Sequence, residues 1–91
     1  MNLEDFQQSA RTQGFAEPLE IQKPKGYAMG GHDHPFDAFA LITQGQIDIG
    51  VGGIVTPYRV GDVFQVPRGT QHTESAVEHG VVYLAARRHP V

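Results

Sequence analysis

Apolar residues recur along the chain with two different spacings, and the spacing changes after the first turn-forming glycine. Near the start, Leu3, Phe6 and Ala10 recur at helical spacing, with acidic residues in the first turn and an arginine near the end. This pattern predicts a short helix over Leu3–Gln13 that ends at Gly14. Because a helix of this length is marginal alone, we expect it to pack on the rest of the chain or on a second subunit.

From Pro18 onward, short apolar stretches alternate with polar residues and are separated by glycine or proline. Alternation with a period of two predicts strands, because successive side chains point to opposite faces of a sheet. The expected strands are Leu19–Gln22, Ala28–His34, Ala38–Thr43, Gln46–Val51, Ile54–Tyr58, Val63–Val66, His72–Val77 and Val81–Ala86. Gln44-Gly45 and Gly52-Gly53 are expected to form tight hairpin turns. Many short strands and one helix predict an all-β fold, a small antiparallel sandwich or barrel.

Length and composition narrow the class of protein. With 91 residues, of which 40% are hydrophobic, the chain predicts one small domain with a modest core. The net charge of −3 offers no basic patch, which predicts no nucleic-acid partner. Lys23, Lys25, Arg87 and Arg88 are interpreted as solvated charges.

The chain has no cysteine, which excludes disulfides and thiolate ligands and is consistent with a reducing compartment. It shows no long apolar run and no basic-then-apolar leader. These features predict a cytoplasmic protein without a membrane partner. The exposed edges of so small a barrel predict a homodimer.

Histidine is the residue type that carries candidate chemistry. His32 and His34 are separated by one residue, so on a strand they would point the same way and could bind one ion. His72 would have to arrive from a neighbouring strand. Three neutral imidazoles with one position open have the composition of a catalytic-type metal site. The alternative is a set of buried imidazoles whose hydrogen bonds are satisfied by the backbone.

These histidines lie in two frames of glycine and proline with fixed spacings. The positions are Gly26, His32, His34 and Gly45 in the first frame, and Gly61, Pro67, Gly69 and His72 in the second. The two frames resemble the two motifs of the cupin family over the stretch from Gly26 to about Ala76. Two family positions differ, because Ala38 stands in the glutamate slot of the first motif and Ala76 in the asparagine slot of the second.

The resemblance implies a small single-domain cupin with an RmlC-like jelly-roll barrel, spanning residues 17–91. Residues 1–16 would form a helix that packs on this barrel or on a dimer partner. The implied cofactor is one divalent metal ion per chain, held by His32, His34 and His72. Fe, Zn, Ni, Cu and Co all accept this ligand set. The set resembles that of the three-His cupins, a group that includes iron-dependent thiol and diketone dioxygenases.

Three further residues are candidates for a place in the site. Asp37 reaches the metal only if the strand bulges, because adjacent residues on a regular strand face opposite sides. Glu74 shares a face with His72, yet two residues along a strand span roughly 6.5–7 Å, which favours a role beside the metal or toward substrate. Glu74 and Tyr83 are the candidate catalytic residues, and no other general base is evident.

Two classes of function therefore stay open. The first is a metal-dependent enzyme, of the dioxygenase type, that acts on a small oxygen- or thiol-bearing molecule, with a proton-abstracting isomerase as a variant. The second is a non-catalytic module that binds or senses a small anion or sugar, or a barrel that the metal merely stiffens. Both predict a small-molecule ligand, and fold alone does not choose between them.

Overall fold

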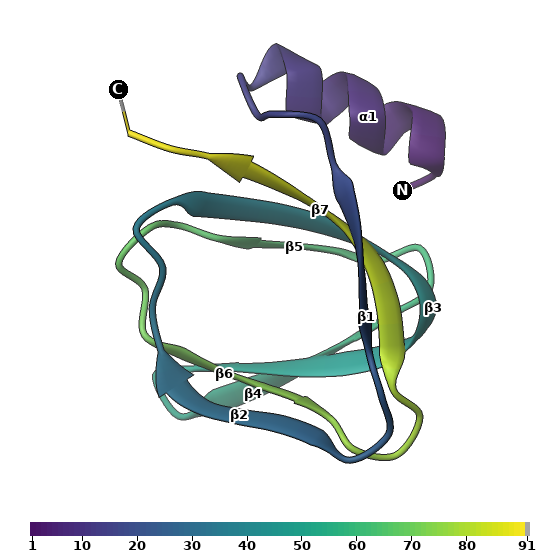
Figure 1. The fold of residues 1–91 in the computed structure, drawn as a ribbon, viewed down its shortest axis with the longest axis vertical. Helices are drawn as coiled ribbons and strands as arrows, with labels where there is room; N and C mark the ends of the chain where they lie inside the picture. The colour runs from purple at the N-terminus through teal and green to yellow at the C-terminus, as the bar shows by residue number, and fades with distance from the viewer. Residues whose placement is uncertain (91) are drawn as a thin grey trace.

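The computed structural model describes residues 1–90 and shows one helix and seven antiparallel strands that curl into a barrel (Figure 1). Helix α1 spans Leu3–Thr12, and the strands are β1 (Leu19–Lys23), β2 (Tyr27–His32), β3 (Asp37–Val51), β4 (Ile54–Arg59), β5 (Val63–Val66), β6 (His72–Ala76) and β7 (Val81–Arg88). The predicted all-β antiparallel barrel with a short N-terminal helix is confirmed.

Strand β3 is long enough to belong to both walls of the barrel. Its first half pairs with β5 and β7, and its second half pairs with β4 and β6. The predicted hairpin at Gln44-Gly45 is wrong, because β3 runs through both residues and bends there, with a register shift between Ile42 and Gln44. Gly45 has a φ of +75°, and a Cβ at this position would collide with the carbonyl of Gly80. The bend therefore requires glycine.

The turn predicted at Gly52-Gly53 does form the hairpin between β3 and β4. Both residues have a positive φ, 59° and 81°, as a two-residue hairpin of this kind demands. One wall of the barrel thus consists of β1, β7, the first half of β3 and β5. The other consists of β4, the second half of β3, β6 and β2.

Helix α1 lies outside the barrel and covers one of its walls (Figure 1). Asn2 caps the helix, since its side chain accepts a hydrogen bond of 2.8 Å from the backbone N–H of Asp5. Phe6 and Ala10 are buried, and the ring of Phe6 lies 4.8 Å from that of Phe39 on the outer face of β3. The apolar face of the helix therefore packs on its own barrel. No helix among residues 1–90 is long and apolar enough to span a membrane.

Candidate metal centre

Three histidines converge at one end of the barrel interior. His32 is the last residue of β2 and lies opposite His72, the first residue of β6. His34 lies two residues beyond the end of β2, so the prediction that one strand presents both His32 and His34 is wrong. The rings nevertheless meet: their centroids are 4.2 Å apart for His32 and His72, 4.9 Å for His32 and His34, and 5.1 Å for His34 and His72.

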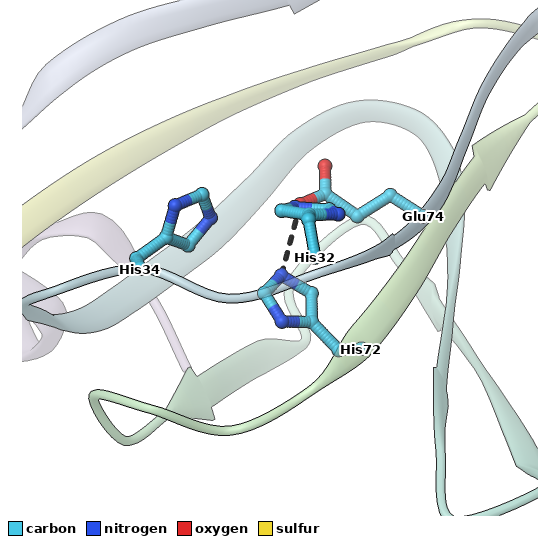
Figure 2. A group of neighbouring side chains, drawn as sticks. All are labelled: His32, His34, His72 and Glu74. Carbon is cyan, nitrogen blue, oxygen red and sulfur yellow. Dashed lines mark hydrogen bonds and ion pairs between the residues drawn. The ribbon is translucent and has the colours of Figure 1, made fainter.

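A carboxylate lies among these rings. Oε2 of Glu74 is 3.1 Å from Nε2 of His32 and 3.2 Å from Nε2 of His72 (Figure 2). Glu74 follows His72 by two residues on β6, and its side chain is long enough to return the carboxylate to the rings. One donor atom from each of the four residues lies within 4.8 Å of every other donor atom. The structure therefore places Glu74 within the cluster, closer than the strand spacing suggested.

Backbone hydrogen bonds fix the orientation of two of the rings. Nδ1 of His32 donates to the carbonyl of Gly30 at 2.8 Å, and Nδ1 of His72 donates to the carbonyl of Thr70 at 2.9 Å. In a neutral imidazole whose Nδ1 carries the proton, Nε2 carries a lone pair. Both Nε2 lone pairs then face the carboxylate of Glu74. Such a group of acceptor atoms is stabilised by a cation bound between them.

The spacing of Glu74 and two of the imidazoles suits a single first-row metal ion. Two ligands at about 2.1 Å from a common ion lie about 3.0 Å apart at a right angle and about 3.4 Å apart at the tetrahedral angle. The separations of 3.1 and 3.2 Å between Glu74 and the two imidazoles fall between these values. The donor set, three imidazoles and one carboxylate, fits a divalent ion such as Fe, Zn, Ni, Cu or Co.

The environment of His34 favours the form that binds metal. Burial lowers the pKa of His34, and the neighbouring His32 and His72 lower it further. Its ring therefore stays neutral to more acidic pH than an isolated histidine would. A neutral ring keeps a lone pair for coordination.

Tyr27 holds the carboxylate in place. Its hydroxyl donates a hydrogen bond of 3.1 Å to Oε1 of Glu74, the oxygen that does not face the two rings. Burial, together with the charge of Glu74 and this hydrogen bond, raises the pKa of Tyr27 to about 12, so the hydroxyl stays protonated. No local pattern in the sequence indicates Tyr27, because its inward orientation depends on a bulge in β2 between Met29 and His32.

Other candidate residues lie outside the cluster. Asp37 accepts from the backbone N–H of Arg68 at 2.8 Å and from the guanidinium of Arg88 at 2.9 and 3.0 Å, and these hydrogen bonds lower its pKa. Its carboxylate is thus engaged elsewhere. His79 has 63% of its side chain exposed and lies 3.7 Å from Glu78. Neither Asp37 nor His79 belongs to the cluster.

A cavity of about 170 Å³ opens beside the four donors. Its wall contains apolar side chains, among them Ala38 and Phe64, and the ring of Tyr83. Burial, followed by the charge of Glu74, raises the pKa of Tyr83, so this hydroxyl too stays protonated. Arg87 is exposed, as its interpretation as a solvated charge predicts, and its side chain also lines this cavity.

The residues that form the barrel match a known protein family. The family model described as "Cupin domain" matches residues 19–85, which include all four members of the cluster. The chain belongs to the cupin family. The resemblance in its two histidine frames is thereby confirmed. No curated protein sequence matches this cupin significantly.

Solved structures similar to this cupin include proteins of different activities. The DMSP lyase DddQ from Ruegeria pomeroyi DSS-3 has 20% identity and a TM-score of 0.70, over 79% of this chain and 37% of the lyase. A predicted oxalate decarboxylase from Thermotoga maritima has 20% identity and a TM-score of 0.70, over 91% and 74% of the two chains. KdgF from Halomonas sp. has 23% identity and a TM-score of 0.61, over 79% and 70%. At 20–23% sequence identity, the similarity to these three structures shows a shared fold and nothing further.

Proposed function

We propose that this cupin binds one divalent metal ion through His32, His34, His72 and Glu74 and acts there on a small molecule as a metal-dependent oxidoreductase of the dioxygenase type. One observation carries the proposal: four donor atoms that lie within 4.8 Å of one another face the cavity beside them. A small ligand in that cavity lies next to the metal. When bound, the metal supplies Lewis acidity and, if it is iron, one-electron chemistry with dioxygen.

The chain's own residues hold and shield this centre. The carbonyls of Gly30 and Thr70 keep two imidazoles in the tautomer that binds metal, and Tyr27 keeps the carboxylate of Glu74 turned toward them. The apolar wall of the cavity limits the access of water to a bound ligand. The ring of Tyr83 lines the cavity, and its protonated hydroxyl can donate a hydrogen bond to a ligand.

The protonation states favour oxidation over proton abstraction. Within residues 1–90, the titratable groups that line the cavity besides the cluster are Tyr27, Tyr83, Lys23 and Arg87. Both tyrosines have a raised pKa, so their hydroxyls stay protonated at neutral pH and neither can accept a proton from a substrate. A dioxygenase that places both oxygen atoms of O₂ in one substrate needs no external reductant. This reaction class therefore suits the residues present.

The same lack of a general base also supports a second candidate, a non-catalytic module that binds a small ligand at the metal. In that case the metal and the cavity would recognise the ligand without transforming it. For either function we propose a cytoplasmic location, since the chain has no cysteine and its site uses nitrogen and oxygen donors alone.

Reconstitution with two metals distinguishes these functions. The iron(II) form should consume dioxygen with at least one compound from a panel of small thiols, diketones and catechols, measured with an oxygen electrode, and the zinc form should not. His72→Ala should abolish the uptake, whereas His79→Ala, a histidine exposed on a turn, should leave it intact. If no compound gives uptake that depends on iron and on His72, dioxygenase activity is contradicted. Metal-dependent thermal shifts with small ligands would then favour the binding module.

A further inference from the structure

Two adjacent arginines near the end of β7 have different surroundings. Arg88 points to the outer face, where its guanidinium donates to the carboxylate of Asp37 at 2.9 and 3.0 Å and to the backbone carbonyl of Gln13 at 2.7 Å. Arg87 points to the inner face and lines the cavity. Among residues 1–90, no carboxylate forms an ion pair with Arg87. A cation therefore faces the cavity without an anionic partner in this part of the chain.

Arg87 lies at the end of the barrel that holds the histidines. Its guanidinium lies over the ring of Phe36, 4.5 Å from the ring centroid, and that ring stacks on His34 with 4.8 Å between centroids. One aromatic ring thus links the guanidinium to a member of the metal-binding cluster.

The residue opposite Arg87 leaves space for a ligand. Arg87 pairs in register with Ala38 on β3, and directly opposed residues of an antiparallel pair project to the same face. Both side chains line the cavity, and the methyl group of Ala38 provides neither charge nor a hydrogen bond. An anionic group of a ligand can therefore approach the guanidinium at this point without competing with a carboxylate at position 38.

The charge of the whole cavity is complementary to an anion. With a divalent ion bound, three neutral imidazoles and Glu74 leave the cluster with one net positive charge. Arg87 adds a second, and Lys23, which lies over the ring of Tyr27 toward the opposite end of β7, adds a third. A cavity of about 170 Å³ has room for a small ligand.

We propose that Arg87 is a substrate-binding residue that holds the carboxylate of a small aliphatic acid, whose other end lies at the metal-binding cluster. The planar guanidinium can bind both oxygens of the carboxylate, which fixes the position of the acid as well as its charge. This inference rests on the proposed function for the metal, but the pairing of arginine with carboxylate does not itself require the metal.

Binding measurements on the zinc-loaded protein test this assignment without relying on activity. The probes are propionate and succinate, each compared with its uncharged amide, and the dissociation constants are measured by NMR titration. We expect the carboxylates to bind wild type at least tenfold more tightly than the amides. Arg87→Gln should raise the dissociation constants of the carboxylates about 10- to 100-fold, the range expected for a hydrogen bond to a charged group.

Three further variants act as controls. Arg87→Lys keeps the charge but loses the planar fork, so its affinity should be intermediate. Arg11→Gln removes an exposed arginine from α1 and should bind the carboxylates as wild type does. Lys23→Gln, toward the other end of the cavity, should weaken binding less than Arg87→Gln. If Arg87→Gln binds the carboxylates as tightly as wild type, or if wild type binds the amides equally well, the assignment is overturned.

Zinc content is measured first, so the two proposals fail in different ways. Wild type that retains no zinc contradicts the proposed metal centre. The same titration on that metal-free protein still tests Arg87, because a guanidinium pairs with a carboxylate in the absence of metal. Carboxylate binding that depends on Arg87 would then support the substrate class, and binding that does not would overturn it.

Discussion

The hydroxyl of Tyr27 donates a hydrogen bond of 3.1 Å to Oε1 of Glu74, while Oε2 of the same carboxylate faces Nε2 of His32 and His72. Oε1 of Glu74 is thus hydrogen-bonded to Tyr27, and Oε2 remains available to a metal ion bound by the cluster. The tyrosine positions the carboxylate without itself being among the four donors. Its effect should therefore be visible in metal affinity.

Tyr27→Phe should lower the affinity for zinc about 10- to 100-fold, the usual effect of losing a hydrogen bond that orients a metal ligand. Competition with a chromophoric chelator measures this change. Tyr58→Phe is the matched control, because Tyr58 lies on β4 and packs on Phe64 outside the cluster. Equal affinities for the two variants would show that Tyr27 does not orient Glu74.

Glu74→Gln should lower the affinity for zinc at least tenfold, because it removes the single anionic donor of the cluster. Ala38→Glu in the Glu74→Gln background should restore much of this affinity, since position 38 also faces the cavity. The exposed Glu78 provides the control Glu78→Gln. The competition assay used for Tyr27 serves here too, and failure of Ala38→Glu to raise the affinity would mean that position 38 is too far from the ion.

The lowered pKa of His34 predicts how the stability of the metal-free protein depends on pH. Between the ordinary histidine pKa of about 6.5 and the lower value in the folded state, the unfolded chain binds more protons. Stability should therefore fall as the pH drops through this range, and His34→Ala should reduce the dependence. Urea unfolding with a chelator present, at a series of pH values, measures it. An unchanged pH dependence in His34→Ala, with His79→Ala as control, would contradict the prediction.

We propose that the protein is a homodimer in which β4 contributes to the interface. Ile54 and Val55 on this strand are 72% and 63% exposed, and within residues 1–90 β4 pairs with β3 alone. An apolar strand with a free edge favours association. Light scattering should give twice the single-chain mass for wild type, and Val55→Lys should shift the protein toward the mass of one chain. A wild-type mass of about 10.0 kDa would rule out the dimer.

Local sequence patterns were sufficient to predict the helix, most of the strands and the three histidines. Alternation with a period of two located the strands. The pair Gly52-Gly53 located the hairpin between β3 and β4, because this turn requires positive φ angles that other residues adopt only with strain. The spacing of the two histidine frames predicted which residues converge. In contrast, the same glycine signal at Gly45 marks a bend within β3, because the contact that requires glycine there comes from Gly80, far away in the sequence.

The surroundings of the histidines depended on strand pairing, which no local pattern contains. The bulge between Met29 and His32 inserts one residue, so Tyr27 turns inward, whereas strict alternation from His32 would place it outside. Sequence spacing placed Glu74 roughly 7 Å along the strand, but the length and direction of its side chain return the carboxylate to the rings. The pairing of Arg87 opposite Ala38 likewise follows from the register of β3 and β7. The sequence alone thus determined most of the strands and the metal-binding residue types. The tertiary structure decided which carboxylate, tyrosine and arginine lie beside the histidines, because these contacts join segments that are distant in the chain.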